Sequence, residues 1–193
     1  MRVHTNQLII GFHGCDEALA NLVISGQKKL SPSANKYDWL GSGIYFWEND
    51  YQRAYEYANE LKGKPKSNIK NPAVVGAIIN LGNCLDLTTR SGLMLVETMY
   101  GFIKNEVNLP KNRKGSLEGA TSDILLRDLD NHVINSIHKL FDETEDQTSF
   151  DSVRAGFWEG EELYPNAGFR KKNHIQISVR HEQSIVAYFK PIA

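Results

Sequence analysis

The sequence contains little cysteine. Its 193 residues include two cysteines, Cys15 and Cys84, and neither forms a CxxC pair or stands near a Cys/His cluster. A zinc site is therefore not expected, and neither is any other metal cofactor. A chain of this length buries enough surface to fold without disulfide bridges, and two free thiols favour a reducing compartment.

Long apolar runs and an excess of charge of one sign are also missing. The apolar run Leu8–Ile10 is too short, and its surroundings too polar, for a signal peptide or a membrane span. We therefore expect a soluble, cytoplasmic protein with no membrane partner. The 22 Lys and Arg residues balance 23 Asp and Glu residues, for a net charge of -1. This balance excludes a generally basic nucleic-acid binder but leaves a local basic face open.

The remaining composition is that of an ordinary globular protein. Hydrophobic residues make up 41% and charged residues 23% of the chain, which excludes disorder of the whole chain. The length suits one domain over residues 1–193, and no linker argues for two. Short β-branched or aromatic runs predict strands at 7–13, 43–47, 74–81, 153–157, 174–180 and 185–189, with 85–87 extending the pairing of 74–81. Apolar residues at helical spacing predict helices at 16–27, 50–61, 91–105 and 121–142.

Three segments carry residues suited to chemistry. Gly11–Gly14 ends the first predicted strand with a His-Gly pair, directly before a helix. Gly41–Phe46 is an aromatic strand flanked by glycines, and His174–Ile177 is a late strand entered from a long irregular loop. Each segment alone has a plainer reading, because a histidine at a strand end is more often structural and a tyrosine in such a strand more often core.

Together with Ala77–Asn83, an apolar strand that ends in a Leu-Gly-Asn turn, these segments resemble the ADP-ribosyltransferase superfamily. The likeness is to its diphtheria-toxin and poly-ADP-ribose-polymerase branch. It covers residues 7–88 and 172–190, and four anchors in one order are more specific than any one of them. The resemblance implies an α+β fold of the ADP-ribosyltransferase type. That fold has two packed antiparallel-rich sheets around an NAD cleft, here with a helical insertion at about residues 90–145.

The resemblance assigns the catalytic positions to His13, Tyr45 and Gln176. His13 would donate a hydrogen bond to a hydroxyl of the adenine-side ribose. Gly14 would pair its backbone with the nicotinamide carboxamide, where a glycine lets ligand and backbone approach closely. Tyr45 would stack on the nicotinamide ring. NAD is the implied co-substrate.

Further NAD contacts follow from the same resemblance. The implied NAD-binding residues are His13, Gly14, Ser42, Tyr45, Arg53 and Tyr55. Arg53 stands where relatives carry a small hydroxyl residue that holds the carboxamide, and it would do the same or reach a phosphate. The second stacking tyrosine is either Tyr55 or Tyr57.

Gln176 is the largest departure from the family pattern. Members that build chains of ADP-ribose carry a glutamate at this place, whose charge stabilises the positively charged ribose. Glutamine keeps the hydrogen-bonding geometry but lacks the charge, so polymer formation is not expected. Glu159 or Glu161, in the loop before the strand, would replace the charge. Arg154 completes the residues expected near the acceptor.

The resemblance implies a mono-ADP-ribosyltransferase that moves one ADP-ribose from NAD to a protein or nucleic acid and releases nicotinamide. Compact bacterial relatives often act as toxins or defence effectors, for which a neutralising antitoxin would be a partner. Two alternatives stay open: a module that only binds NAD or ADP-ribose, which Gln176 favours, and an NAD glycohydrolase that uses water as acceptor. An accidental match in an unrelated α+β interaction domain would show no NAD binding.

Overall fold

The structure is a computed structural model that describes residues 7–65, 67–114, 126–145 and 147–192. Its strands are β1 (Leu8–Asp16), β2 (Ile44–Glu48), β3 (Pro72–Asn80), β4 (Cys84–Asp86), β5 (Ser152–Phe157), β6 (His174–Val179) and β7 (Ile185–Phe189). Its helices are α1 (Glu17–Ile24), α2 (Tyr51–Leu61), α3 (Arg90–Ile103) and α4 (Asp128–Glu143), with a 3-10 turn at Glu182–Ser184. The mixed α and β organisation expected from the sequence is therefore observed.

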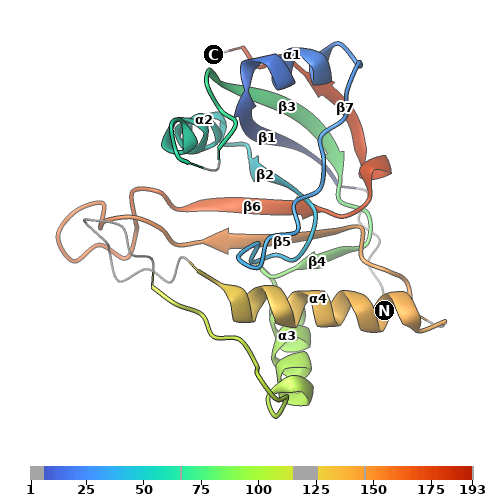
Figure 1. Ribbon diagram of the computed structural model, residues 1–193. Helices are drawn as coiled ribbons and strands as arrows, with labels where there is room; N and C mark the ends of the chain where they lie inside the picture. Colours follow the sequence, from blue (N-terminus) through green and yellow to red (C-terminus); the bar gives the residue numbers. More distant parts are fainter. Residues whose placement is uncertain (1–6, 66, 115–125, 146, 193) are drawn as a thin grey trace.

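The strands form a single sheet in the order β4-β5-β6-β2-β1-β3-β7. All pairings are antiparallel except the parallel pairing of β4 with β5. Two packed sheets were expected, and one continuous sheet is found, because β1 and β2 still pair at Gly11↔Glu48 and Phe12↔Trp47. This short pairing joins a half made of β1, β3 and β7, uppermost in Figure 1, to a half made of β2, β6, β5 and β4.

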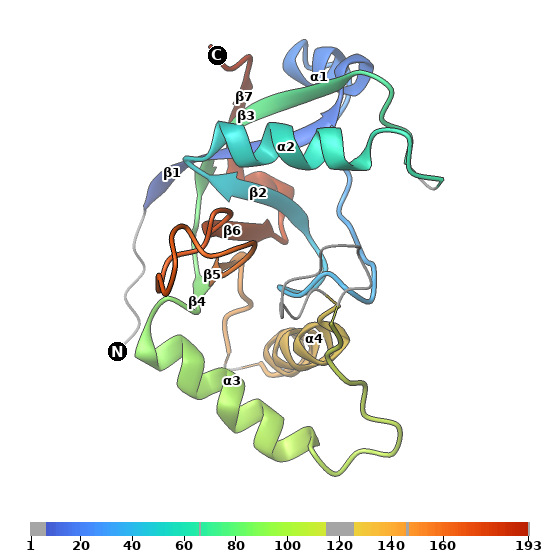
Figure 2. The same ribbon diagram turned by 90° about the vertical axis from the view of Figure 1, so that its left-hand side faces the viewer.

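Two main cores lie on these halves. One packs α1 against β1 and β3 around Phe46, and the other packs α3 and α4 against the lower strands around Ile137 and Val153. Figure 2 shows α2 lying across β1 and β2, with α3 and α4 at the opposite end of the molecule. The predicted helix starts at Asp16 and Asp50 are confirmed, because each carboxylate accepts a backbone N–H of the first helical turn.

Two predicted elements differ from the structure for long-range reasons. The helix expected from residue 121 begins at Asp128, while residues 121–125 lie outside the described parts of the chain. Its first turn is capped from elsewhere, because Oδ1 of Asn112 accepts from the N–H groups of Leu129 and Asp130. The expected pairing of 85–87 with strand 74–81 is wrong, because β4 pairs with β5 instead.

The inner face of α4 buries a histidine. His138 is 4% exposed, and neither ring nitrogen has a hydrogen-bond partner within the described residues. Burial, together with the nearby positive charge of Arg180, lowers the pKa of His138 to about 3, against the opposing effect of Asp142. The ring is therefore neutral in the folded protein at neutral pH.

We expect this histidine to make the fold sensitive to mild acid. Between pH 3 and 6.5, His138 is protonated in the unfolded chain but stays neutral in the folded chain. The free energy of unfolding therefore falls as the pH falls. From pH 7 to pH 5 the loss is about 2 kcal/mol. Urea unfolding at both pH values should show a smaller loss for His138→Leu than for the wild type. An equal loss in both proteins would contradict this assignment.

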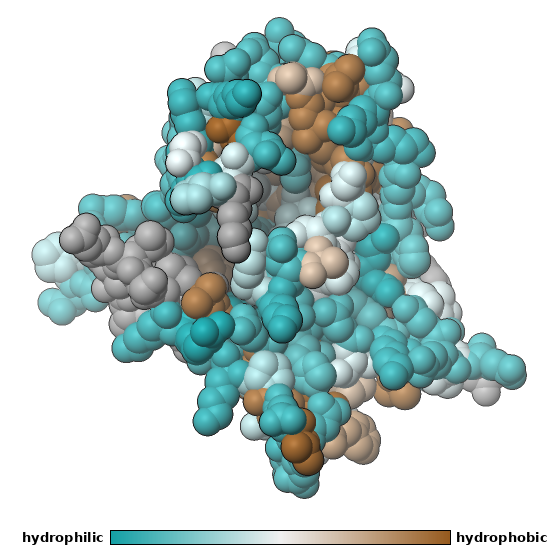
Figure 3. All heavy atoms as spheres, viewed as in Figure 1, coloured by the Kyte–Doolittle hydropathy of each residue, from teal (hydrophilic) through white to brown (hydrophobic). Residues whose placement is uncertain are grey.

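The outer face of α3 is apolar. Its exposed large side chains are Leu93, Met94, Tyr100 and Phe102. Figure 3 shows apolar atoms at this lower end of the molecule, among mostly hydrophilic surroundings. Within the described residues, no helix has the length and apolar character needed to cross a bilayer.

Candidate functional site

A cavity of about 730 Å³ opens where β1 and β2 stop pairing. Beyond Phe12↔Trp47, β1 continues to Asp16 on β3, whereas β2 runs on β6. The two strands therefore expose backbone and side chains at the point where they separate. Seven of the residues singled out in the sequence line this cavity: His13, Gly14, Tyr45, Arg53, Tyr57, Glu159 and Gln176.

His13 bridges the two separating strands. Its Nδ1 lies 2.8 Å from the carbonyl oxygen of Tyr45. Because a carbonyl only accepts, Nδ1 carries the proton, and in the neutral ring Nε2 is then an acceptor. Burial lowers the pKa of His13, and the hydrogen bond to Tyr45 opposes this only in part, so the ring is neutral. With Nδ1 donating to Tyr45, Nε2 of His13 is left as a hydrogen-bond acceptor.

Tyr45 presents its ring to the cavity and uses its hydroxyl inside the protein. The hydroxyl donates to the carbonyl of Gly41 at 2.8 Å and accepts from the N–H of Leu40 at 2.9 Å. Burial raises the pKa of Tyr45 well above its ordinary value, with a further contribution from Asp38. The hydroxyl is thus a fixed structural group, and the ring face is the part available for stacking.

Substituting Tyr45 by Phe should separate these two roles. Tyr45→Phe removes both hydrogen bonds to the Leu40–Gly41 turn, so the free energy of unfolding should fall by about 1–3 kcal/mol. The ring remains, so activity at the site should be kept, whereas Tyr45→Ala should lose it. Urea unfolding and a parallel activity assay check both halves. Loss of activity in Tyr45→Phe with an unchanged fold would instead give the hydroxyl a chemical role.

Gly14 lies between the cavity and α2. A Cβ atom at this position would come within 2.1 Å of the carbonyl oxygen of Ala54 and 3.3 Å of the Ala58 side chain. The glycine is therefore required by the close approach of the helix to the strand. Close packing of α2 is thus a second reason for a glycine at this position, besides the close approach of a ligand expected from the sequence.

Gln176 lies on β6 opposite Trp47 and Ala155, and cross-strand partners share a face. Its Oε1 accepts a hydrogen bond from Nε1 of Trp39 at 2.7 Å. This bond leaves the amide NH₂ of Gln176 as a donor at the cavity wall. The neighbouring Ile177 is completely buried on the other face, as the alternation predicted.

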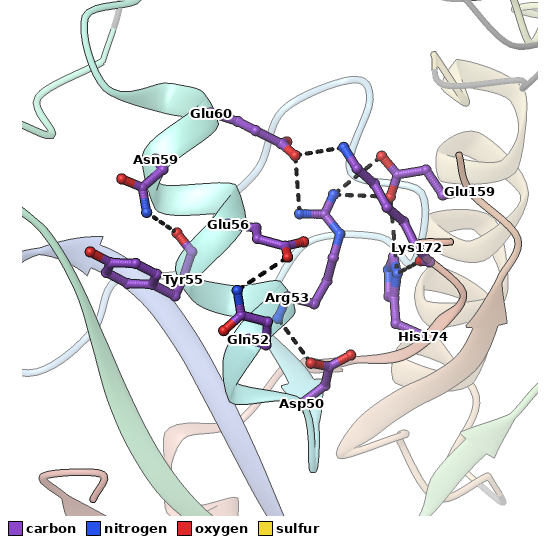
Figure 4. A network of polar contacts seen from close by, with 10 residues as sticks. All are labelled: Asp50, Gln52, Arg53, Tyr55, Glu56, Asn59, Glu60, Glu159, Lys172 and His174. Atoms are coloured by element: carbon purple, nitrogen blue, oxygen red, sulfur yellow. Dashed lines mark hydrogen bonds and ion pairs between the residues drawn. The ribbon is translucent and has the colours of Figure 1, made fainter. Parts of the chain in front are cut away.

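Arg53 and Glu159 form an ion pair at the cavity wall. Nη2 of Arg53 lies 3.2 Å and 3.0 Å from the two carboxylate oxygens of Glu159. Nη1 of the same guanidinium lies 3.5 Å from Glu60, which Lys172 also contacts at 2.8 Å. Figure 4 shows this chain of contacts, which ties α2 to the loop between β5 and β6. The Arg53 guanidinium is thus engaged by carboxylates of the protein itself.

Two residues expected at the NAD site lie outside the cavity lining. Tyr55 is 37% exposed and stacks on Tyr51, with ring centroids 6.2 Å apart. Tyr57, the other candidate for that position, lines the cavity. Ser42 is exposed, and its backbone N–H donates to the side chain of Asn135.

Two residues expected near the acceptor also lie outside the lining. Arg154 sits between Val153 and Ala155 on β5 and so faces the other side of the sheet. There it pairs with Glu48 at 2.6 Å, and the hydrogen bond to Glu48 raises the pKa of Arg154 further. Glu161 is exposed and pairs with a lysine of its own loop, 2.8 Å away.

Aromatic residues form much of the wall, and three of them, Trp39, Trp47 and Phe157, were not singled out as site residues from the sequence. Trp39 and Phe157 lie with ring centroids 5.0 Å apart, and Trp47 and Tyr57 lie 4.9 Å apart. All four line the cavity. They provide flat apolar surfaces on which a planar ligand group can stack.

The loop that carries Trp39 is held by α4. Nδ2 of Asn131 donates to the carbonyl of Asp38 at 2.8 Å, and Oδ1 of Asn135 accepts from the N–H of Ser42 at 3.2 Å. The carboxylate of Asp38 in turn accepts from the hydroxyl of Ser33 at 2.7 Å. A helix from the segment without a counterpart in the resembled family therefore shapes one wall of the cavity.

The described residues contain no group of three or more His, Cys, Asp or Glu side chains that could hold a metal ion.

Comparison with known proteins finds a relative over part of the chain. The chain is 30% identical over 110 residues to an uncharacterized protein of Methanocaldococcus jannaschii, a match that covers 56% of this chain and 49% of that protein. The chain thus matches about half the length of that relative. No family model and no solved structure matches the chain.

Proposed function

We propose that the protein is an NAD-dependent mono-ADP-ribosyltransferase with an ADP-ribosyltransferase-like fold. One observation carries the proposal: His13, Gly14, Tyr45 and Gln176, assigned by resemblance to one NAD site, line one cavity. They come from β1, β2 and β6, with up to 163 positions between them in sequence (13 to 176). A chance likeness of motifs gives no reason for these positions to converge.

The chemistry of the lining suits NAD. A volume of about 730 Å³ lies within the range of ligand pockets. The half-buried rings of Tyr45 and Tyr57 offer stacking surfaces for nicotinamide or adenine. Nε2 of His13 accepts from a ribose hydroxyl, and the amide of Gln176 donates to one. No metal is required by any of these contacts.

The reaction needs positioning and charge stabilisation. The N-glycosidic bond of NAD breaks, nicotinamide leaves with the bonding electron pair, and a lone pair of the acceptor forms the new bond to the same ribose carbon. Positive charge develops on the ribose during this exchange, as in other glycosyl transfers. His13 and Gln176 orient the ribose hydroxyls, and Tyr45 holds the departing ring, so the bound substrate is close to its reactive geometry.

Gln176 bears on the extent of the reaction. Its side chain is neutral, so it orients the ribose without stabilising the developing charge. Transfer of single units, without chain growth, suits this site. The same neutrality favours the second candidate, a module that binds NAD or ADP-ribose without turnover. A role as a toxin or defence effector, with an antitoxin as partner, is compatible with either activity.

Labelled NAD tests the proposal and sorts its alternatives. Incubation of the purified protein with NAD labelled in its adenylate part and a cell lysate should place label on protein or nucleic acid, and digestion of each class identifies the acceptor. Tyr100→Ala, an exposed tyrosine on α3 outside the cavity lining, should label equally well, whereas Tyr45→Ala should not. Free ADP-ribose alone would indicate a glycohydrolase. Thermal protection by NAD with no product would indicate a binding module, and no protection would contradict the NAD site itself.

A further inference from the structure

A transferase of this type needs negative charge close to the reacting ribose, and Gln176 supplies none. The cavity lining itself offers other carboxylates. They are Asp16, Asp38, Glu60 and Glu159. Their contacts show which of them is placed to act on a ligand.

Asp16 is committed to the fold. Its Oδ1 accepts from the N–H of Ala18 and caps α1. Its Oδ2 accepts from the N–H groups of Lys70 and Asn71, at 2.8 Å and 3.0 Å. Both oxygens therefore hold the start of α1 against the segment before β3.

Asp38 organises its own loop. Its Oδ2 accepts from the hydroxyl of Ser33 and the N–H of Asn35, at 2.7 Å and 2.5 Å. The side chain is folded back onto residues three and five positions earlier in the chain. Its contacts thus explain it as the anchor of the loop that carries Trp39.

Glu60 lies between Arg53 and Lys172 in the polar network of Figure 4. One of its oxygens contacts both Arg53 and Lys172, at 3.5 Å and 2.8 Å, and its side chain is 36% exposed. Both Glu60 and Glu159 pair with Arg53, but Glu60 is the more exposed of the two, so solvent screens its charge from the cavity more strongly. Glu60 fixes the guanidinium of Arg53 from the side away from Glu159.

Glu159 is the carboxylate that is held beside β6, the strand that carries Gln176. Its side chain is 17% exposed, and one oxygen lies 4.0 Å from Nδ1 of His174. His174 and Gln176 are two positions apart on β6, on one face of the sheet, which corresponds to about 7 Å along the strand. The charge of Glu159 therefore lies beside His174, two positions along β6 from Gln176.

Arg53 fixes the position of this carboxylate. Its side chain is 6% exposed, so the ion pair with Glu159 is largely removed from solvent. The ring of Trp47 packs below the guanidinium, 5.8 Å from centroid to Cζ. A carboxylate held this way needs little reorganisation when charge develops beside it.

We infer that Glu159 supplies the negative charge that stabilises the ribose during transfer, and that Gln176 only orients the ribose. The inference rests on the proposed function. Glu159 forms no bond in the step: the ribose passes from nicotinamide to the acceptor, nicotinamide keeps the bonding pair, and the acceptor's proton goes to water. The negative charge thus comes from Glu159 in the loop before β6, whereas Gln176 on β6 is neutral.

The test compares charge removal with charge relocation. Glu159→Gln keeps an oxygen that accepts from Arg53 but removes the charge, so kcat for nicotinamide release should fall by roughly 10²–10³. The dissociation constant for NAD should change far less. Adding Gln176→Glu to that variant returns a carboxylate two positions along β6 from His174, where it still accepts from Nε1 of Trp39. This double variant should recover at least tenfold of the lost rate.

If Glu159→Gln lowered the rate only by disturbing the loop, adding Gln176→Glu would not restore it, because a charge on β6 does not repair the packing of the loop. Glu162→Gln, a neighbouring exposed carboxylate outside the cavity lining, is the matched control and should keep the wild-type rate. A wild-type rate in Glu159→Gln, or no recovery in the double variant, overturns the inference and leaves the proposed function standing. A wild-type protein that binds NAD without releasing nicotinamide overturns both.

Discussion

His13→Ala should reduce the release of nicotinamide by about 10²-fold or more. The substitution removes the acceptor nitrogen at the cavity and the hydrogen bond that joins β1 to Tyr45 where the strands separate. Loss of one preorganised polar group of this kind costs roughly 10²–10³ in rate. Product formation from NAD should be measured well below the melting temperature of the variant, since removing a buried ring also lowers stability.

His132→Ala is the matched control for this prediction. His132 lies on α4, and its side chain is 37% exposed and contacts Glu106 at 2.7 Å. It is outside the cavity lining, so its loss should leave the rate of nicotinamide release unchanged. A rate within about threefold of the wild type in His13→Ala would remove His13 from the mechanism.

Gly14→Ala should destabilise the fold more than any other single-methyl addition near the site. The added Cβ would meet the carbonyl oxygen of Ala54 at 2.1 Å, and a backbone atom of a packed helix cannot move aside cheaply. Overpacking of this kind costs about 1–3 kcal/mol, and the backbone position of the clash favours the upper end. Urea unfolding measures the change, and the release of nicotinamide should fall because α2 shifts against the cavity.

Gly101→Ala provides the opposite expectation with the same added methyl. Gly101 lies in α3, and a Cβ there would meet nothing within 4 Å. Alanine in an exposed helix interior is favoured over glycine by about 0.5–1 kcal/mol, so this variant should gain stability. Equal stability changes in the two variants would contradict the packing of α2 on β1.

Local patterns predicted the elements well, and long-range contacts explain where they did not. Asp16 and Asp50 marked helix starts because a capping carboxylate acts within its own turn. The start of α4 was missed because its cap comes from Asn112, on another segment. The partner of β4 was not predicted because the sequence of a strand does not show which distant strand it pairs with.

The same division holds for the candidate site. The period of two along β6 was enough to direct Gln176 to the face opposite Ile177. Ala54 and Ala58 mark the inner face of α2 but lie symmetrically between Tyr55 and Tyr57, and only the burial of Arg53 turns that face toward Tyr57. The bond from Trp39 to Gln176 spans 137 positions and follows no spacing rule.

Arg154 was placed near the acceptor only because it is close in sequence to the loop after β5. Its neighbours Val153 and Ala155, however, are buried on the opposite face. Alternation along β5 directs Arg154 to Glu48 and Asp86, on the far side of the sheet. The periodicity of a strand therefore outweighs nearness in the chain when a side chain is assigned to a site.

The release of nicotinamide from NAD by the purified wild-type protein tests the central claim most directly. The proposed site predicts release that continues beyond one equivalent per protein molecule when an acceptor is present, and that His13→Ala and Tyr45→Ala abolish. A folded wild-type protein that releases no nicotinamide, with acceptor present, would contradict the proposed activity. Thermal protection by NAD in that same protein would then identify the cavity as a binding site without catalysis.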